Sequence, residues 1–371
     1  MNSKLFFTAT TLLISIFIAV DPIGLFTPPS VTFSSNKLRR AEILPLVGAI
    51  GAESFAFDPI GGGPYTGVSG GRIIKWQENE RQWVNFALTS TERREKCEGW
   101  HDDEEMEHIC GRPLGLCFNE LTGDLYVADA YLGLLMVGPD GGSATRIVTQ
   151  AQSIPFRFTN GLDIHQRSGA VYFSDSSSNY QRREFLSLII SGDKTGRLLK
   201  YDPESKQVTV LLDKLSYLNG VALSEDGSFI LLAETINCRI LKFWLQTSKA
   251  GTYEVLLQLP GFPDNIKRSP RGDYWVAVYS KKGKLLQWIL SYTWLRKVLL
   301  KLPHKILKLH SVFAKWKGYA LAIRFSEEGE VLEVLENKRG NTLKLISEVE
   351  EKNGTLWIGS VVMPFVGVYK M

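Results

Sequence analysis

The 371-residue chain has no apolar run long enough to be assigned as a membrane span. The nearest candidate is the stretch 5–20, which three threonines and a serine interrupt, whereas a spanning helix needs about 20 apolar residues. With Lys4 before it, this short stretch predicts a secretory signal peptide over residues 1–20. Because no distinct small-residue cleavage site follows, an uncleaved N-terminal anchor is the alternative.

Cysteine and histidine are scarce, with four and five residues in the whole chain. Cys97 and Cys110 flank an acidic segment that has too few apolar side chains to fold by itself. In an oxidising compartment we expect these two residues to form a disulfide that closes the segment. His101 and His108 lie among its carboxylates, but a solvated loop held by the disulfide explains them better than a metal site. Asn353 begins the one N-glycosylation sequon and is expected in a turn.

Motifs for nucleotides and nucleic acids are also missing. The glycine run 61–63 is followed by a predicted strand instead of a helix, so it forms a turn and not a phosphate-binding loop. The one strongly basic segment without acidic residues, 281–317, has no recognition motif, and this pattern argues against a nucleic-acid partner.

The chain instead repeats one short pattern, in which a polar residue precedes an alternating apolar run that is typical of a β-strand. Asn160 and Asn219 begin the plainest copies, and the runs that begin at Glu53, Leu114 and Asp264 are similar. In three copies an acidic residue follows a glycine after fourteen positions: Gly115 and Asp129, Gly161 and Asp175, Gly220 and Glu234. This constant offset identifies an internal repeat.

A repeat of about 45 to 60 residues with short strands and glycine-rich turns is typical of a β-propeller. Six units are found, the last of them at 346–371. The sequence therefore predicts an all-β, six-bladed β-propeller over residues 41–371, after an extended lead-in at 21–40. Residues 41–47 are expected to close the ring against the C-terminal strands.

Two helical inserts are predicted over one mouth of the propeller channel, at about 181–191 and about 281–317. The second contains ten Lys or Arg residues and no Asp or Glu, whereas the whole chain has a net charge of only +4. Its pattern fits a helix that lies on an anionic membrane surface through residues such as Trp288, Tyr292, Trp294, Lys297 and Lys301. A lid over the channel whose charged side faces solvent is an equally good interpretation.

The residue that enters each inner strand of a propeller points at the channel axis. Glu53, Asn160, Asn219 and Asp264, with Asn265 beside them, are therefore expected to converge. Carboxylate and amide oxygens suit Ca²⁺, which takes about six to eight oxygen ligands, whereas Zn²⁺ prefers His or Cys. The pattern predicts a site for a divalent cation, Ca²⁺. The alternative is that these residues only form turns that lead into strands.

Several segments resemble the plant strictosidine synthase-like proteins, and the likeness extends from about Leu44 to the end of the chain. The segments that carry it are Arg182–Phe185, Thr195–Asp202, Leu218–Leu223, Ala233–Arg239 and Leu259–Ile266. That family resembles in turn the paraoxonase and regucalcin groups of calcium-dependent six-bladed lactonases. The resemblance implies metal ligands at Glu53, Asn160, Asn219, Asp264 and Asn265. It also implies a location in the secretory pathway, in the vacuole or in the lumen or membrane of the endoplasmic reticulum.

Two positions depart from the catalytic residues of these relatives. Strictosidine synthase condenses tryptamine with secologanin and uses a Glu of the last blade as the base, and the matching residue here is Ser347. A serine hydroxyl cannot accept the amine proton at neutral pH. Neighbouring Glu348 is expected on the opposite face of a regular strand. The His that paraoxonases use in the second blade corresponds to about Leu114.

The sequence thus predicts a metal-assisted hydrolase of a small ester or lactone substrate, in which the cation polarises the carbonyl group and lowers the pKa of a bound water. The candidates for the base are Glu53, Asp175, Glu234, Asp264 and Glu348. For Asp129, Asp175 and Glu234 the alternative role is to cap strand ends by bonding backbone amides. The alternative functions are condensation of the strictosidine synthase type and non-catalytic ligand binding by the propeller.

Overall fold

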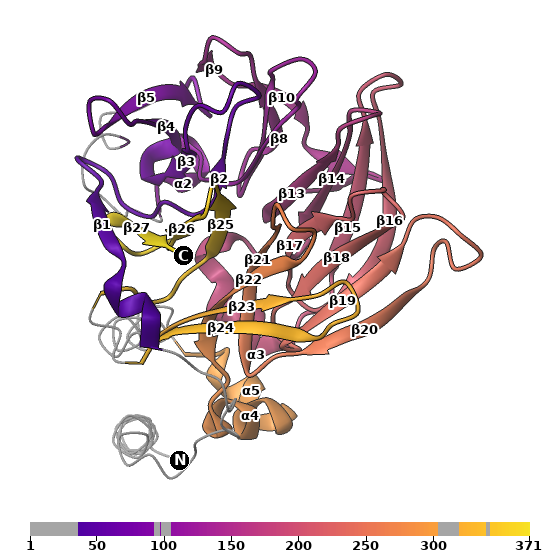
Figure 1. Cartoon of the computed structure of the whole chain (residues 1–371). Coiled ribbons are helices and arrows are strands. Elements are labelled where there is room, and N and C mark those ends of the chain that lie inside the picture. Colours follow the sequence, from indigo (N-terminus) through magenta and orange to yellow (C-terminus); the bar gives the residue numbers. More distant parts are fainter. Residues whose placement is uncertain (1–35, 93–96, 98–104, 303–318, 339–341) are drawn as a thin grey trace.

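In the computed structural model the described residues are 36–92, 97, 105–302, 319–338 and 342–371. They form six sheets of four or five strands around a common axis, which is the predicted six-bladed β-propeller (Figure 1). The predicted signal or anchor at 1–20, most of the lead-in and 303–317 of the basic insert lie outside the described residues. Within the described part of the chain, no helix is long and apolar enough to cross a membrane.

Each blade is one sheet, and its first strand lines the channel. Blade 1 contains β2 (Phe55–Ala56), β3 (Tyr65–Val68), β4 (Arg72–Gln77), β5 (Gln82–Leu88) and the short parallel strand β9 (Gly142–Ser143). Blade 2 contains β6 (Pro113–Phe118), β7 (Leu125–Asp129), β8 (Gly133–Val137) and β10 (Thr145–Val148). Blade 3 contains β13 (Thr159–His165), β14 (Ala170–Asp175), β15 (Gly196–Asp202) and β16 (Gln207–Leu215).

The other three blades follow the same order. Blade 4 contains β17 (Leu218–Leu223), β18 (Phe229–Glu234), β19 (Arg239–Trp244) and β20 (Tyr253–Gln258). Blade 5 contains β21 (Gly261–Arg268), β22 (Tyr274–Lys281), β23 (Ala320–Phe325) and β24 (Val331–Asn337). Blade 6 contains β25 (Glu348–Lys352), β26 (Thr355–Gly359), β27 (Phe365–Lys370) and β1 (Glu42–Pro45). A two-stranded hairpin, β11 (Gln150–Ala151) and β12 (Ile154–Pro155), precedes blade 3.

Blade 6 is assembled from both ends of the propeller. Strand β1 pairs antiparallel with β27, with Ile43 opposite Gly367. Figure 1 shows the indigo β1 next to the yellow β27. The first described strand therefore closes the ring against the last, as predicted for residues 41–47.

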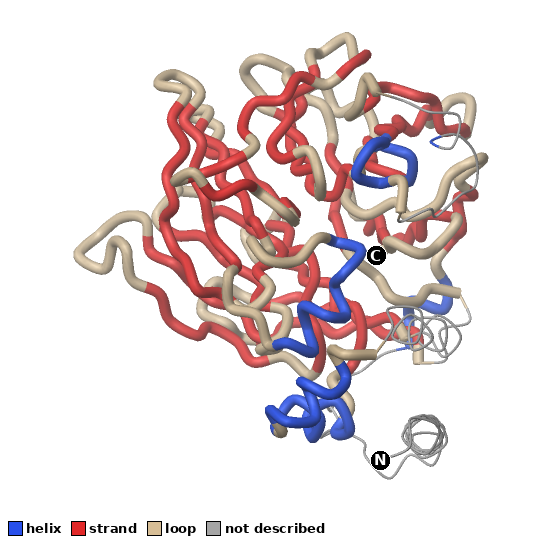
Figure 2. Tube along the Cα trace, turned by 180° about the vertical axis from the view of Figure 1, so that it is seen from behind, coloured by secondary structure: helices blue, strands red, loops and turns tan. Residues whose placement is uncertain are grey.

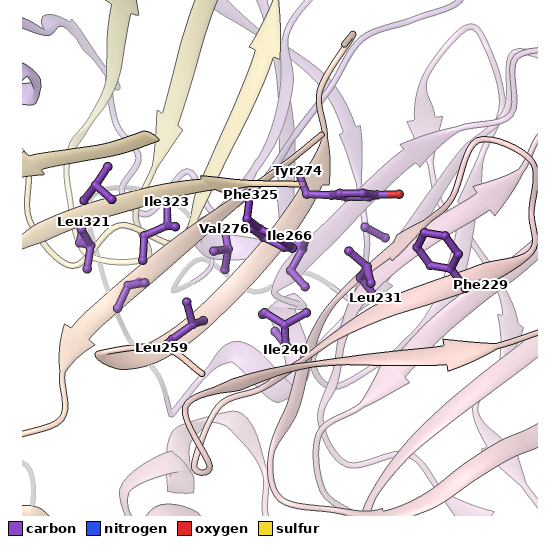
Figure 3. Packing of buried hydrophobic residues seen from close by; sticks show 14 residues of the cluster. Phe229, Leu231, Ile240, Leu259, Ile266, Tyr274, Val276, Leu321, Ile323 and Phe325 are labelled. Carbon is purple, nitrogen blue, oxygen red and sulfur yellow. The ribbon is translucent and has the colours of Figure 1, made fainter. Parts of the chain in front are cut away.

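The hydrophobic core lies between adjacent blades, because alternate residues of each strand face one neighbouring sheet. Between blades 4 and 5, Leu231 and Ile240 pack in one cluster with Val276 and Ile323 (Figure 3). Comparable clusters lie between the other pairs of neighbouring blades. Each fully buried Leu or Ile contributes about 1.5–3 kcal/mol to stability, so the ring is held mainly by these contacts.

Close to the axis, neighbouring inner strands touch backbone to backbone, and this contact explains the repeated glycine. A Cβ atom at Gly161 would lie 2.8 Å from the carbonyl oxygen of Asn219. At Gly220 it would lie 2.7 Å from the carbonyl oxygen of Asp264. Only glycine allows this approach, which brings the polar residue of one blade next to that of the following blade.

The first predicted insert consists of η5 (Arg182–Glu184) and helix α3 (Phe185–Ser191). Leu188 of α3 is fully buried in a cluster with residues at the beginning of three inner strands: Leu114, Phe158 and Tyr217. Helix α3 therefore covers the mouth of the channel at which the inner strands begin, and Figure 2 shows it lying across this face.

The second insert provides helices α4 (Lys284–Ser291) and α5 (Thr293–Leu299). Arg296 of α5 donates a hydrogen bond to the carbonyl oxygen of Ser191 in α3 at 3.3 Å. In Figure 1 the two helices lie together next to α3. The first insert and the described part of the second are thus found at the same mouth of the channel, as predicted.

Candidate functional site

The polar residues of the repeat lie in irregularities of the inner strands. The pairing of β13 with β14 shifts register between Thr159 and Leu162, and that of β17 with β18 shifts between Leu218 and Val221. In blade 5 the shift lies between Pro263 and Ile266. Asn160, Asn219 and Asp264 are therefore bulge residues, and a bulge can turn a side chain out of the regular alternation of a strand. This local geometry directs all three toward the axis.

The structure places two of the expected ligands in contact and a third close to them. Asn219 Nδ2 donates a hydrogen bond to Asp264 Oδ1 at 2.6 Å, although blades 4 and 5 supply the two residues. Glu53 is buried and close enough to Asp264 that burial and the Glu53 carboxylate together raise the pKa of Asp264 well above its usual value. Asn160 and Asn265 are also buried at the beginning of their strands. Blade 2 contributes apolar Leu114 at the matching position.

Among the described residues, three buried oxygen atoms of these ligands have no hydrogen-bond partner: Glu53 Oε2, Asn160 Oδ1 and Asn219 Oδ1. A buried oxygen without a partner costs about 1–3 kcal/mol, so three of them at one place need a physical reason. A hard cation would provide it, because Ca²⁺ binds carboxylate and amide oxygens. Among the described residues, no three His, Cys, Asp or Glu side chains are grouped as metal ligands, since two of the four oxygen donors here are amides.

The acidic residues that follow each glycine by fourteen positions have a different task. Asp129 accepts hydrogen bonds from the backbone N–H groups of Arg112, Tyr131 and Leu132. Asp175 accepts from Phe158 N at 3.1 Å, and Glu234 accepts from Ser216 N at 2.8 Å. Asp175 and Glu234 also form ion pairs with Arg197 and Arg239, both at 2.5 Å. These bonds match the strand-end role that was the alternative for all three residues.

Ser347 and Glu348 both link blade 6 to blade 1. Ser347 is fully buried, and its Oγ donates to the carbonyl oxygen of Glu53 at 2.6 Å. The backbone carbonyl of Ser347 accepts a hydrogen bond from Asn265 N at 2.9 Å. Glu348 Oε1 accepts from Phe55 N at 2.6 Å. Ser347 therefore holds the backbone of an expected ligand, and Glu348 is already bonded to the neighbouring blade.

A lysine that sequence reasoning missed connects four of the blades through their inner strands. Lys267 Nζ donates to the carbonyl oxygens of Phe55 and Leu116 at 3.3 and 3.5 Å. It also lies 3.7 Å from Glu348 and 4.0 Å from Glu350. One ammonium group thus bridges blades 1, 2 and 6 from blade 5. Its only signal in the sequence is a charged residue on an inner strand, three positions after Asp264.

Two arginines reach the axial residues from the covered mouth. Burial raises the pKa of Glu53, and Arg112 and Arg182 oppose that rise. Arg182, at the start of the α3 insert, forms an ion pair with Glu107 at 2.5 Å. Glu107 belongs to the short helix α2 (Glu107–Cys110), and the predicted disulfide between Cys97 and Cys110 is confirmed. The disulfide-closed segment therefore helps to hold a positive charge near Glu53.

The buried carboxyl groups of Glu348 and Glu350 should make the stability of the protein depend on pH. Burial raises the pKa of Glu348 to about 8 and that of Glu350 to about 7, while Lys267 opposes both shifts. Both pKa values exceed the unfolded value of 4.5, so the folded state binds the proton more tightly than the unfolded chain does. The resulting stabilisation is fully present below pH 4.5 and is lost as the pH rises through the folded-state pKa values. We expect the free energy of unfolding of the chelated protein to fall from about pH 5 to about pH 8.

Urea unfolding in a chelator, repeated at each pH, checks this expectation. The pKa values of Glu53 and Asp264 are also raised, so these two groups add to the loss of stability as the pH rises. A bound cation should remove their contribution to the pH dependence, because it binds the deprotonated carboxylates. The same series with Ca²⁺ should therefore depend less on pH. A chelated protein that becomes more stable between pH 5 and pH 8 would contradict these pKa shifts.

The remaining predicted sites are at the surface. Asn353 lies exposed in the turn between β25 and β26, with φ of 51°, as expected for the sequon. Its glycosylation stays a prediction. His108 is exposed next to the disulfide, while His101 lies outside the described residues. On α4 and α5, the side chains of Trp288, Tyr292 and Trp294 are 48%, 43% and 63% exposed. Lys297 and Lys301 are exposed as well.

Solved structures of other proteins share this fold. A gluconolactonase from Xanthomonas campestris matches with a TM-score of 0.57 and 14% sequence identity, over 92% of each chain. Regucalcin from Agrobacterium tumefaciens, described as a calcium-binding protein, matches with a TM-score of 0.54 and 14% identity, over 91% of this chain and 96% of that one. At such low identity these likenesses establish the fold alone.

Sequence comparisons identify the family. The family model for strictosidine synthase matches residues 160–248, and the model for the strictosidine synthase-like N-terminal region matches residues 33–76. In Arabidopsis thaliana, strictosidine synthase-like protein 10 is 53% identical over 94% of this chain and 92% of its own length. Strictosidine synthase-like protein 2 from the same plant is 54% identical over 89% of each chain. The chain therefore belongs to the strictosidine synthase-like family.

Proposed function

We propose that this protein is a metal-assisted hydrolase of a small apolar ester or lactone, with a divalent cation, Ca²⁺, at the propeller axis. The observation that carries the proposal is the group of buried, unpartnered oxygens of Glu53, Asn160 and Asn219 next to the Asp264 carboxylate. The proposal is also supported by the fold that this chain shares with a gluconolactonase and with regucalcin, which is described as a calcium-binding protein.

A bound cation would supply a Lewis acid for the substrate carbonyl group. The side chains that would hold it are Glu53, Asn160, Asn219 and Asp264, with Asn265 next to them. We assign the proton-accepting role to Asp264 Oδ2, because Asn219 already occupies Oδ1. Among the other candidates, Asp175 and Glu234 are paired with arginines and Glu348 accepts from Phe55 N, while Glu53 is assigned to hold the cation.

The surroundings of the axis favour an apolar substrate that enters from the α3 side. Leu114, Phe158, Leu188 and Ile236 form one buried cluster with Tyr217 at this mouth. These apolar side chains exclude water from this end of the axis, which favours a substrate with an apolar portion.

The test is hydrolysis of a panel of aryl esters and lactones by the purified protein, after chelation and after reloading with Ca²⁺. We expect Asp264→Asn to lower kcat/KM by a factor of about 100 or more, because it removes a ligand charge and the proton acceptor together. Asp226→Asn, in an exposed turn, is the matched control. A protein that binds Ca²⁺ but hydrolyses none of the panel would favour the non-catalytic ligand-binding alternative.

The structure also bears on the condensation of tryptamine with secologanin. Its base would have to stand where Ser347 donates to the Glu53 carbonyl. We expect no condensation product above the buffer control, measured by mass spectrometry with both substrates at saturating concentration, because a serine hydroxyl cannot accept the amine proton. Product well above that control would show that another group, such as Glu348, performs this step.

We also propose that α4 and α5 dock the covered mouth on an anionic membrane surface. Three aromatic side chains are exposed there, and Lys297 and Lys301 lie exposed on the same insert. Lys282 and Arg296 are bonded to the protein instead, to Ile236 O and Ser191 O. The charge of this insert favours membrane docking over the alternative, a lid whose charged side faces solvent. Residues 281–317 contain ten Lys or Arg residues and no Asp or Glu.

Vesicle co-sedimentation checks this docking. We expect binding to vesicles that contain phosphatidylserine to exceed binding to neutral vesicles and to weaken at high salt, since each Lys near the surface contributes about 1 kcal/mol. Replacing Lys297, Lys301, Lys305 and Lys308 with Gln should remove most of the difference. Equal binding to neutral and anionic vesicles, or sedimentation that the four substitutions leave unchanged, would contradict the electrostatic docking.

A further inference from the structure

The inner strands of the propeller carry charged side chains that bond to the backbones of neighbouring blades. Each inner strand is an edge strand of its sheet, so one side of its backbone has no partner strand. Buried N–H and C=O groups on such an edge need other partners. Glu348 Oε1 accepts from Phe55 N at 2.6 Å, and Asp163 Oδ2 accepts from Leu223 N at 2.8 Å. Carboxylates of two inner strands therefore hold N–H groups of the next blade.

Lys267 performs the corresponding task for carbonyl groups. Its Nζ donates to the carbonyl oxygens of Phe55 and Leu116 at 3.3 and 3.5 Å. The same atom lies 3.7 Å from Glu348 Oε1 and 4.0 Å from Glu350 Oε2. Two carbonyl oxygens and two carboxylates thus surround one ammonium group, and they come from blades 1, 2 and 6. This combination of oxygen atoms is one that hard metal cations bind in proteins.

The surroundings keep this ammonium group charged. Its side chain is only 19% exposed, and a charge enclosed to this degree is stable only where opposite charges and hydrogen bonds compensate it. Burial by itself lowers the pKa of Lys267, but the carboxylates of Glu348 and Glu350 outweigh burial and raise that pKa above its ordinary value. Lys267 therefore supplies a permanent positive charge between the inner strands.

We propose that Lys267 is a built-in cation, whose ammonium group fills a position between the inner strands that a metal ion would otherwise occupy. It joins blades 1, 2, 5 and 6 through oxygen atoms, as a bound metal would, but it cannot dissociate because it is tethered to β21. The junction of these blades is then independent of free metal, and only the site at Asp264 exchanges its ion with solvent. This inference concerns other residues than the hydrolase proposal and does not rest on it.

The experiment uses Asp264→Ala as the background, so that Ca²⁺ at the axial site does not contribute. In this background Lys267→Ala removes the ammonium group and leaves its space open to an ion. We expect its thermal midpoint in chelator to fall by about 5–10 °C, because breaking an enclosed ion pair leaves carboxylates without a partner. Excess Ca²⁺ should restore at least half of this loss. Asp264→Ala alone should not respond to Ca²⁺.

Two other substitutions of Lys267 in the same background are the controls. Lys267→Met fills the space with an apolar chain, so its midpoint should fall as well, but Ca²⁺ should not restore it. Lys267→Arg keeps a tethered positive charge, so it should remain folded in chelator and should not respond to Ca²⁺. A Lys267→Ala protein that Ca²⁺ does not stabilise, or that it stabilises no more than Lys267→Met, would overturn the inference.

The calcium content of the variants gives a second measurement that does not depend on stability. Equilibrium dialysis against Ca²⁺ at about pH 8.5, followed by elemental analysis, counts the ions that each chain holds, with the carboxylates available as ligands. We expect Lys267→Ala to hold one more Ca²⁺ than Lys267→Arg. Equal calcium contents would overturn the inference. A wild type that holds no Ca²⁺ would contradict the axial site instead, because the comparison of the two Lys267 variants is made without it.

Discussion

Saturating Ca²⁺ should raise the free energy of unfolding of the wild type by about 2.7 kcal/mol at a hundredfold excess over Kd. The gain arises because the folded state presents the oxygens of Glu53, Asn160, Asn219 and Asp264 together, whereas the unfolded chain does not. Asp264→Ala should abolish most of this gain, because it removes one of the two carboxylates. Thermal unfolding at a fixed pH, with Ca²⁺ and with chelator, measures both effects.

The chelated Asp264→Ala protein adds a further comparison. Burial and Glu53 raise the pKa of Asp264, so its charge is unfavourable without a cation. We therefore expect the variant to be no less stable than the wild type in chelator and clearly less stable in Ca²⁺. Asp226→Ala should respond to Ca²⁺ as the wild type does. A wild-type midpoint that chelation does not change would contradict the axial cation site.

Gly220→Ala should destabilise the protein by about 3 kcal/mol, at the upper end of the effects of overpacking. The added Cβ would lie 2.5 Å from Ile266 N and 2.7 Å from Asp264 O, and both are backbone atoms that cannot turn aside. Blades 4 and 5 would have to separate at the axis. Because Asn219 and Asp264 lie on these two strands, Ca²⁺ affinity should fall in parallel with stability.

The control for Gly220→Ala is Gly138→Ala. A Cβ at Gly138 would meet nothing within 4 Å, so this variant should change stability by less than about 0.5 kcal/mol. Urea unfolding gives the stability, and calorimetric titration with Ca²⁺ gives the affinity. If both alanine variants were equally stable, close contact between inner strands would not be what aligns the axial residues.

The repeat made the fold predictable from the sequence. The offset of fourteen residues between glycine and acid reflects the pairing of the first two strands of a blade. The residue two positions before the glycine lies opposite the acid, as Thr159 lies opposite Asp175. The axial residues were predictable for the same reason, since blades 1, 3, 4 and 5 each place a polar residue at the same point of the repeat. The closing strand and the disulfide followed from their positions in the chain.

Other parts of the site could not be found in this way. Lys267 bonds to carbonyl groups of two other blades, and such contacts depend on the closed ring instead of on any local pattern. The pairing of Arg182 with Glu107 joins an insert to a disulfide-closed segment 75 residues away. The left-handed backbone of Tyr217 has no signal in its sequence, because glycine or asparagine is the usual residue for that conformation.

The most direct measurement of the central claim is an anomalous difference map from crystals of the protein soaked in Tb³⁺, with chelated crystals as the reference. The account predicts one strong peak on the propeller axis, in contact with oxygen atoms of Glu53, Asn160, Asn219 and Asp264. It also predicts that the peak disappears in Asp264→Ala crystals soaked in the same way. A map without a peak at these four residues, or with its main peak elsewhere on the protein, would contradict it.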